Sequence, residues 1–147
     1  MSTTSTILLV EDNEDDEILT LRALQKNKIA NEVVVARDGA AALDYLFCRG
    51  AWASRDPNAL PQLVLLDLNL PKVSGLGVLR ELRADARLRA MPVVVLTSSQ
   101  EDEDVIESYQ LGANSYVRKP VDFKQFTEAV RTLGLYWLVL NQVPGKR

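Results

Sequence analysis

Reactive side chains follow directly after short apolar runs at four places along the sequence. In chain order they are Glu11, Asp12, Asp67 with Asn69 two positions later, Thr97, Ser98 and Lys119. If the apolar runs are parallel strands of one sheet, their carboxyl ends share one edge, where such sheets bind ligands. We therefore predict that these residues form one crevice that combines carboxylates, hydroxyls and a lysine.

The predicted crevice gathers three carboxylates, Glu11, Asp12 and Asp67, and needs compensating positive charge. Two like charges about 4 Å apart repel by roughly 4 kcal/mol at an effective dielectric constant near 20. Lys119 supplies one positive charge, and a divalent cation would supply the rest. The chain contains no histidine and a single cysteine, so the ligands on offer are oxygens, which favour Mg²⁺ over zinc or copper.

A carboxylate bound to such a cation can act as a nucleophile and form an acyl phosphate. The cation and Lys119 would then neutralise the phosphoryl oxygens. Thr97 offers a hydroxyl donor to one of those oxygens, and Ser98 is small enough to leave room for the incoming group. The residue types therefore favour phosphoryl-group chemistry.

Each of these residues taken singly also has an ordinary structural explanation. An Asp after a strand is usually a turn former or a helix cap, and a Thr or Lys there is usually solvated surface. The acids between positions 11 and 16 could simply form an acidic first helical turn, and this is our interpretation of Asp15 and Asp16. The whole set is harder to explain in that way, because four different strands each deliver a suitable group.

Apolar runs and helical patterns alternate along the chain. The predicted strands are 7–10, 33–35, 63–66, 93–96 and 115–118. The predicted helices are 14–27, 40–48, 75–86, 101–111 and a last one from 123 onward, with Asp38 and Asp122 at helix starts. The first helix should bury Ile18, Leu21 and Leu24. Because the strands are continuous apolar runs, the pattern indicates an α/β fold, a doubly wound parallel sheet of five strands with helices on both faces.

Length and composition narrow the protein class. The 147 residues suffice for one ordinary domain, and 47% of them are hydrophobic. The net charge of −3 gives no general attraction to nucleic acid or to anionic membranes. We see no signal peptide and no apolar run of membrane-spanning length, so a cytoplasmic location is expected.

The motifs at the strand ends, taken in order, form a recognisable set. They are Val10-Glu11-Asp12, Leu66-Asp67-Leu68-Asn69-Leu70-Pro71 with Gly75, Leu96-Thr97-Ser98, and Tyr116 with Lys119-Pro120. This set resembles the receiver domain of two-component response regulators, from about residue 7 to about residue 133. The resemblance implies the flavodoxin-like strand order 2-1-3-4-5 with five helices. It also implies a single stand-alone receiver domain over 1–147, with a short extension at 134–147.

The resemblance implies that the protein is a phosphoacceptor signalling switch. Asp67 would accept a phosphoryl group from the phosphohistidine of a partner sensor kinase. Lys119 would pair with the phosphoryl oxygens, and Thr97 and Tyr116 would be the switch pair. The chain would catalyse only its own phosphorylation and slow dephosphorylation. The Lys119–Pro120 peptide bond would be cis.

The resemblance also implies a metal-binding set. Asp12 and Asp67 would bind Mg²⁺, with the backbone carbonyl of Asn69 as a third ligand and Mn²⁺ as the alternative ion. Glu11 would act through a metal-bound water.

Two segments lie outside this plan. The connection 49–62 is long for a helix-to-strand loop, and the tail 133–147 begins with apolar residues around Trp137. Both are similar to response regulators paired with bacterial phytochromes. A helical seam continues into the tail through Phe126, Val130, Leu133, Trp137 and Leu140. We predict that the last helix and the tail form the interface of a two-fold homodimer.

Two other functions use similar residue types. A Mg²⁺-dependent phosphatase with an aspartyl nucleophile also combines Asp, Thr or Ser, Lys and Mg²⁺, but its nucleophile normally follows the first strand in an Asp-x-Asp arrangement. A pseudo-receiver would bind partners without being phosphorylated, and the intact set of reactive residues argues against it.

Overall fold

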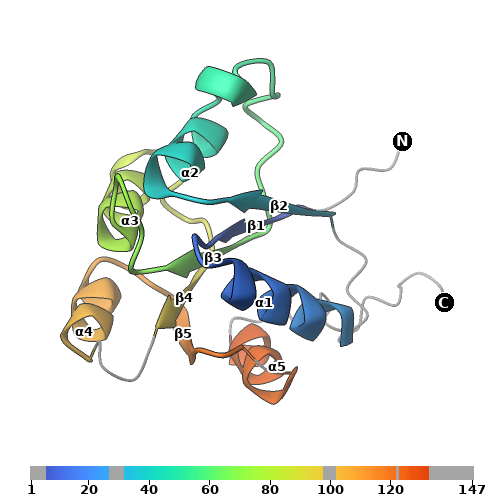
Figure 1. The fold of residues 1–147 in the computed structure, drawn as a ribbon. Coiled ribbons are helices and arrows are strands. Elements are labelled where there is room, and N and C mark those ends of the chain that lie inside the picture. The colour runs from blue at the N-terminus through green and yellow to red at the C-terminus, as the bar shows by residue number, and fades with distance from the viewer. Residues whose placement is uncertain (1–5, 27–31, 98–101, 122, 133–147) are drawn as a thin grey trace, which may run out of the picture.

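The computed structural model describes residues 6–26, 32–97, 102–121 and 123–132, in which five strands and five α-helices alternate (Figure 1). The strands are β1 (Thr6–Val10), β2 (Glu32–Ala36), β3 (Leu63–Asp67), β4 (Val93–Thr97) and β5 (Ser115–Arg118). The helices are α1 (Glu14–Lys26), α2 (Gly39–Leu46), α3 (Gly75–Ala84), α4 (Asp102–Gln110) and α5 (Phe123–Thr132), with one 3-10 turn, η1 (Gly50–Trp52). The predicted elements are confirmed, with ends that differ by one or two residues.

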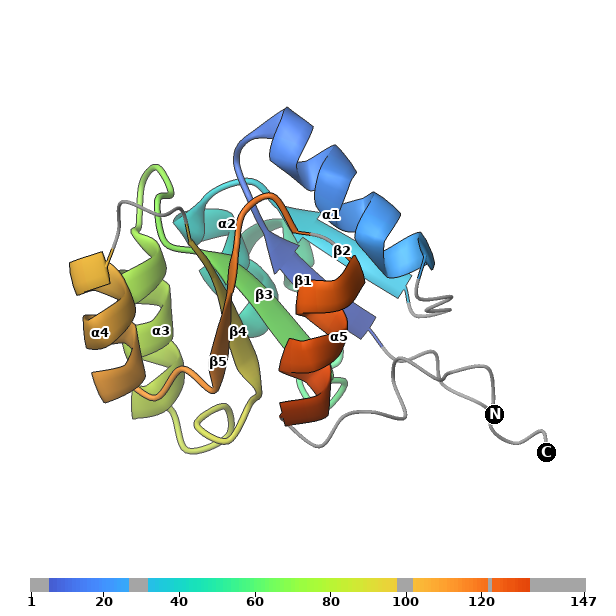
Figure 2. The same ribbon diagram turned by 90° about the horizontal axis from the view of Figure 1, so that it is seen from below.

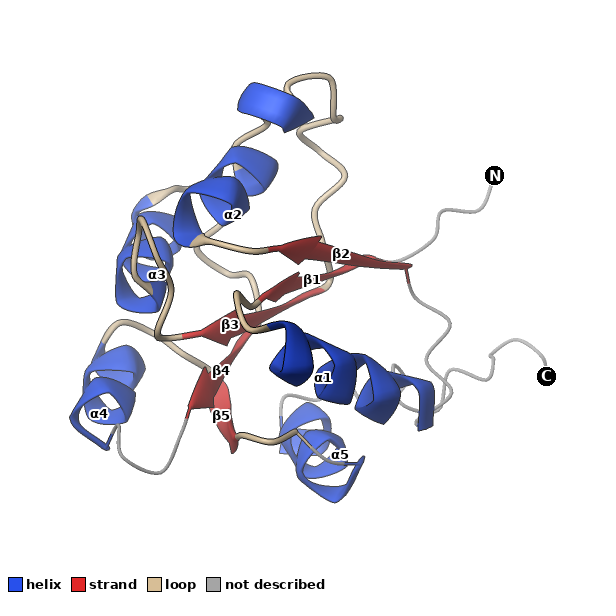
Figure 3. Cartoon of the chain, viewed as in Figure 1, coloured by secondary structure: helices blue, strands red, loops and turns tan. Residues whose placement is uncertain are grey.

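The strands form one parallel sheet in the order β2-β1-β3-β4-β5, so the predicted order is also confirmed (Figure 3). The central strands β3 and β4 are apolar up to their last residues, Asp67 and Thr97, because helices cover both of their faces. In the ladders, Val10 pairs with Leu66, Asp67 with Leu96, and Thr97 with Arg118. This register brings the carboxyl ends of β1, β3, β4 and β5 to one edge of the sheet.

Helices cover the two faces of the sheet in separate layers (Figure 2). Alternate strand residues such as Leu8 and Val64 face α2 and α3, while Ile7 and Leu65 face α1 and α5. The α4 helix lies beside α3 at the edge of its layer. The two apolar cores hold the sheet rigid, so its edge presents the strand ends in fixed positions.

The α1 helix buries a different face from the one predicted. Thr20, Ala23 and Leu24 are buried, whereas Ile18 is 43% exposed. Since each helical residue turns by about 100°, Ile18 lies about 120° around the helix from Leu24 and leaves the contact with the sheet. The prediction that Ile18 belongs to the buried face is therefore wrong.

Side-chain caps begin three of the helices. The Asp38 carboxylate accepts a hydrogen bond from the Ala41 backbone N–H at 2.7 Å, which confirms the predicted start of α2. Ser74 caps α3 in the same way, and the Asn13 side chain accepts from the backbone N–H of Asp16 at 2.9 Å in α1. These caps fix the direction in which each helix leaves its strand.

The long connection 49–62 packs against α2 through two aromatic rings and an arginine. Trp52 lies edge-on to Tyr45 with ring centroids 4.8 Å apart, and the Arg55 guanidinium lies over the Tyr45 ring at 4.3 Å. Arg55 also donates to the backbone carbonyls of Tyr45 and Ala59. Arg87, beyond α3, donates to the Pro57 carbonyl at 2.6 Å. The connection is therefore held at the amino ends of the strands. It lies away from the sheet edge where the carboxyl ends of the strands, including Asp67, meet.

Several predictions concern residues outside the described part of the chain. These are the role of Ser98, the cap by Asp122, and the tail seam through Leu133, Trp137 and Leu140. The single-domain division with an extension at 134–147 likewise stays a prediction. Within the described ranges, no helix combines the length and the apolar character needed to cross a bilayer.

Candidate functional site

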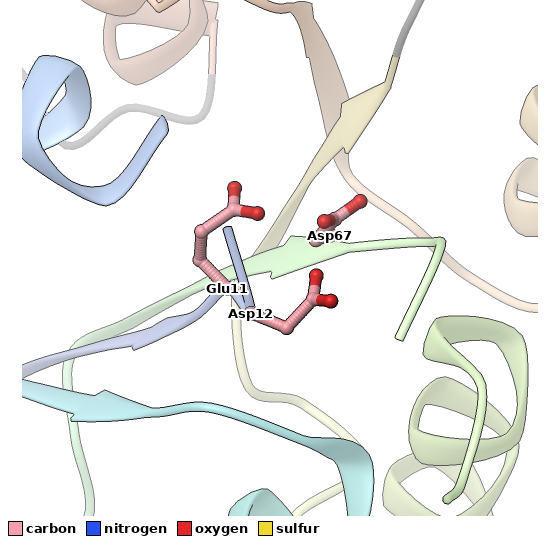
Figure 4. Close-up of side chains that lie close together, drawn as sticks. All are labelled: Glu11, Asp12 and Asp67. Atoms are coloured by element: carbon pink, nitrogen blue, oxygen red, sulfur yellow. The ribbon is translucent and has the colours of Figure 1, made fainter. Parts of the chain in front are cut away.

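The site lies where β1 and β3 end, at the centre of the sheet edge (Figure 4). Glu11 and Asp12 directly follow β1, and Asp67 is the last residue of β3. One carboxylate oxygen from each of the three lies within 4.8 Å of the others. Glu11 and Asp67 are buried, and Asp12 is exposed. The structure therefore brings together the three carboxylates that the sequence predicts.

Lys119, just beyond β5, closes the site with several hydrogen bonds. Its Nζ lies 3.3 Å from both carboxylate oxygens of Glu11, 3.2 Å from Asp67 Oδ2 and 2.8 Å from Asp16 Oδ2. The Lys119 backbone N–H donates to the Thr97 carbonyl at 2.8 Å, which ties the end of β5 to the end of β4. The Lys119–Pro120 bond is cis, as predicted. One ammonium group therefore serves three carboxylates.

The loop after β3 holds the other oxygen of Asp67. The backbone N–H of Asn69 donates to Asp67 Oδ1 at 3.0 Å. A Cβ added at Gly75 would collide with the backbone carbonyl of Asp67 and lie 2.6 Å from the Cα of Leu68. Only glycine allows α3 to approach the end of β3 so closely, and this explains why Gly75 accompanies the aspartate in the sequence.

Burial and charge shift the acid–base properties of the site. Burial raises the pKa of Glu11 to about 8, and the hydrogen bond and charge of Asp67 add to the effect. For Lys119, burial alone would lower the pKa, but the hydrogen bond to Asp16 and the charges of Asp67 and Glu11 raise it above the usual range. Without a metal, the site therefore keeps a charged lysine and favours a protonated Glu11.

We expect the free energy of unfolding of the metal-free protein to fall as the pH rises from 6 to 8. The folded state holds the Glu11 proton more tightly than the unfolded chain, where the ordinary pKa is 4.5. The stability from this proton is therefore fully present below pH 4.5 and is lost as the pH rises through about 8. Urea unfolding in EDTA should show that the free energy of unfolding falls by about 2 kcal/mol between pH 6 and pH 8.

The Glu11→Gln variant is the control for this effect, because glutamine keeps the shape of the side chain and does not titrate. Its stability should be nearly flat over the same pH range, where no histidine of this chain contributes. Saturating Mg²⁺ should largely remove the slope for the unchanged protein, because a cation binds the deprotonated carboxylates and the folded state then holds no extra proton at Glu11. A metal-free protein that becomes more stable towards pH 8 would contradict the prediction.

The site suits a small, hard cation. All three charged ligand groups are carboxylates, they converge within 4.8 Å, and one is exposed to solvent. Mg²⁺ and Mn²⁺ prefer such oxygen ligands and retain several waters, for which the exposed side of Asp12 leaves access. The donor set therefore fits the ion expected from the sequence.

The two predicted switch residues lie on β4 and β5, the strands next in order after β3. Thr97 ends β4 and is buried. The ring of Tyr116 on β5 is 46% exposed and packs edge-on against Tyr109 of α4, with centroids 5.9 Å apart. Ser98 lies outside the described residues.

Comparison with known proteins assigns the family. The family model described as the response regulator receiver domain matches residues 7–131. The chain belongs to this family. The receiver domain is the signalling module of two-component systems, so the resemblance stated from the motifs is confirmed.

Relatives of this receiver span nearly its whole length. The probable methanogenesis regulatory protein FilR2 of Methanothrix harundinacea is 43% identical over 95% of this chain and 87% of its own. The response regulator Rcp1 of Synechocystis is 39% identical over 95% of this chain and 92% of its own.

Solved structures share the fold of this receiver. The bacteriophytochrome response regulator RtBRR has a TM-score of 0.86 and 54% identity, and the match covers 97% of this chain and 86% of that one. Mn²⁺-bound Rcp1 has a TM-score of 0.75 and 38% identity, covering 95% and 97% of the two chains. The phosphorylated cyanobacterial phytochrome response regulator RcpA has a TM-score of 0.75 and 37% identity, and the match covers 97% of this chain and 98% of that one.

The structure adds one residue to the receiver site that the sequence did not reveal. We interpreted Asp16 as one of the acids of the first helical turn, and it does lie there, but its carboxylate is also the nearest partner of Lys119, which the interpretation did not include. The available signal was Asn13, whose side chain caps Asp16 and so fixes where the first turn of α1 begins. Side chains in that turn point back towards the end of the preceding strand.

Proposed function

We propose that this receiver accepts a phosphoryl group on Asp67 from the phosphohistidine of a partner sensor kinase and thereby switches a signalling conformation. The observation that supports this most is the position of the Asp67 carboxylate. It lies within 4.8 Å of two further carboxylates and 3.2 Å from the Lys119 ammonium, at the carboxyl end of the central strand. Such a group is close both to ligands for a cation and to a fixed positive charge.

Each residue has a defined part in the proposed transfer. An oxygen of Asp67 attacks phosphorus, a new O–P bond forms, and the N–P bond of the phosphohistidine breaks to release the imidazole. Lys119 stabilises charge on the transferred oxygens from its fixed place beyond β5. Thr97, at the neighbouring strand end, donates a hydrogen bond from its hydroxyl to one of those oxygens. Ser98 leaves room for the phosphoryl group.

Asp12, Asp67 and the Asn69 carbonyl are the groups that would hold the cation directly, and Glu11 would act through a metal-bound water. When bound, Mg²⁺ would neutralise charge on the phosphoryl oxygens as a Lewis acid. The convergence of three carboxylates supports this assignment, as does the Mn²⁺-bound state named for Rcp1. The phosphorylated state named for RcpA supports phosphoryl acceptance.

Incubation with acetyl phosphate and Mg²⁺, followed by intact-mass measurement, tests the proposal. The unchanged chain should gain about one phosphoryl group, and Asp67→Asn should gain none. Chelation of the metal should abolish labelling. Sustained hydrolysis of many phosphomonoesters would instead indicate a phosphatase, and the absence of labelling at saturating donor would indicate a pseudo-receiver.

The conformational switch would involve Thr97 and Tyr116. We propose that phosphorylation draws the Thr97 hydroxyl towards Asp67 and that the ring of Tyr116 then leaves Tyr109 and turns inward. The exposed, edge-on position of the Tyr116 ring is the arrangement that such a change would start from.

The partner is proposed to be a histidine kinase of the bacterial phytochrome type, in the cytoplasm. The 54% identity to a bacteriophytochrome response regulator supports this choice. The match covers most of the length of Rcp1 and of RtBRR, and we also propose that residues 1–147 act as a single receiver domain.

We further propose a two-fold homodimer that uses α5 and the tail. A groove of about 660 Å³ runs between β5 and α5, with Tyr116, Arg118 and Lys124 in its lining, and β5 is an edge strand of the described sheet. Sedimentation should show a dimer at tens of micromolar. Removal of residues 134–147 should shift the protein towards monomer, and a monomeric full-length chain under these conditions would contradict the proposal.

A further inference from the structure

Among the side-chain contacts of Lys119 in the site, the contact with Asp16 is the shortest. Its Oδ2 lies 2.8 Å from Nζ, whereas Asp67 Oδ2 lies at 3.2 Å and the Glu11 oxygens at 3.3 Å. The Asn13 side chain accepts from the Asp16 backbone N–H, so Asp16 has a defined place in the first turn of α1. The lysine therefore has a well-positioned partner on α1 in addition to its partners at the ends of β1 and β3.

These contacts compete for a limited number of donors. The ammonium group has three N–H donors, and four carboxylate oxygens from three residues surround it. A phosphoryl group on Asp67 would add further oxygens, so Lys119 must weaken one of its present contacts to reach them. The Asp16 side chain is 27% exposed and that of Glu11 is fully buried. Water can replace the lysine at Asp16 far more easily than at Glu11, so Asp16 is the partner that is released.

We propose that Asp16 is a positioning residue that holds Lys119 in the unphosphorylated receiver and gives it up when Asp67 is phosphorylated. This inference rests on the proposed function of Asp67. In this role Asp16 opposes phosphorylation, because engagement of Lys119 with the phosphoryl group requires loss of the Asp16 contact. Asp16 thereby slows the gain of the phosphoryl group and shortens the lifetime of the acyl phosphate.

The negative charge of Asp16 also opposes phosphorylation, as its contact with Lys119 does. With acetyl phosphate as donor, Asp67 forms a new O–P bond, the O–P bond to acetate breaks, and acetate leaves with the electron pair. The Asp67 side chain changes from one negative charge to about two. A fixed carboxylate on the first turn of α1 repels this added charge.

Labelling kinetics with acetyl phosphate test the inference. At saturating Mg²⁺, Asp16→Asn should be labelled about fivefold faster and lose the phosphoryl group about fivefold more slowly, a factor that corresponds to a partly exposed ion pair. Asp15→Asn is the matched control, because it removes the same charge from an exposed side chain one residue earlier in the same turn. It should behave like the unchanged protein.

A spectroscopic measurement separates the exchange of partners from a general change in stability. The ¹⁵N signal of the Lys119 ammonium should shift in Asp16→Asn relative to the unchanged protein. After addition of beryllofluoride, an acyl phosphate mimic, the two proteins should give the same Lys119 signal, because the lysine has left position 16 in both.

The outcomes distinguish the inference from the proposed function. If the unchanged protein is labelled on Asp67 but Asp16→Asn is no faster, or Asp15→Asn is equally fast, the positioning role is overturned and the proposed function stands. A Lys119 signal that still differs between the beryllofluoride-treated proteins also overturns it. If the unchanged protein takes up no phosphoryl group at all, both proposals fail.

Discussion

Replacement of Lys119 by methionine should destabilise the metal-free protein by about 3 kcal/mol at pH 8. Glu11 and Asp67 are both buried and would lose the Lys119 ammonium group that they share. At pH 6 the loss should be smaller, because Glu11 with a pKa of about 8 already carries a proton. Labelling of Asp67 by acetyl phosphate should slow by about 100-fold, the cost of removing one fixed donor from a transferring group.

Urea unfolding at both pH values and intact-mass kinetics measure these effects. Lys72→Met is the matched control, since Lys72 is 69% exposed and its nearest described acid, Asp38, lies 3.7 Å away. That variant should stay within about 0.5 kcal/mol of the unchanged protein and keep its labelling rate. Equal effects of the two substitutions would show that the Lys119 contacts contribute nothing specific.

Gly75→Ala should lower stability by about 2–3 kcal/mol and impair phosphoryl acceptance. The new methyl group would collide with the Asp67 carbonyl and the Leu68 Cα, which are backbone atoms that side-chain rotation cannot move away. The end of β3 must shift to relieve the collision, and a displaced Asp67 loses its alignment with the other carboxylates. A displacement of about 1 Å can cost roughly 100-fold in rate. Thermal unfolding and labelling kinetics provide the measurements.

Gly77→Ala tests whether the effect belongs to position 75 or to α3 as a whole. Its Cβ would meet side-chain atoms of Val73 and Ser74 at 2.9 Å and 3.4 Å, and these atoms can adjust. Alanine also favours the helical backbone by about 1 kcal/mol over glycine. This variant should therefore lie within about 1 kcal/mol of the unchanged protein, with normal labelling. A Gly75→Ala protein as stable and as active as Gly77→Ala would contradict the proposed close packing.

The strands and the site edge could be predicted because the relevant signals are local. Continuous apolar runs at β1, β3 and β4 have few alternatives to a doubly covered parallel sheet, and each run ends where a polar residue begins. Once the sheet is parallel, the carboxyl ends must share an edge, so Glu11 and Asp67 meet although they are 56 positions apart in the sequence. The Asp38 cap was likewise visible from its place before a helical pattern.

The remaining features depend on directions and distances that the sequence pattern does not contain. Asp16 stands among several acids of equal chemistry, and only the three-dimensional path of α1 selects it as the partner of Lys119. Ile18 was misplaced because the angle of α1 on the sheet, not apolarity alone, decides which face is buried. The contacts of Arg55 and Arg87 are made to backbone carbonyls, which carry no residue-specific signal.

The fastening of the 49–62 connection has a consequence for protein engineering. Its arginine and aromatic contacts tie it to α2 at the amino ends of the strands, so the connection and the reactive edge lie at opposite ends of the strands. Exposed positions there, such as Ser54 and Asn58, are suitable for a fluorophore or an affinity handle. A reporter attached at one of these positions would follow the receiver in solution while the phosphoacceptor edge stays unmodified.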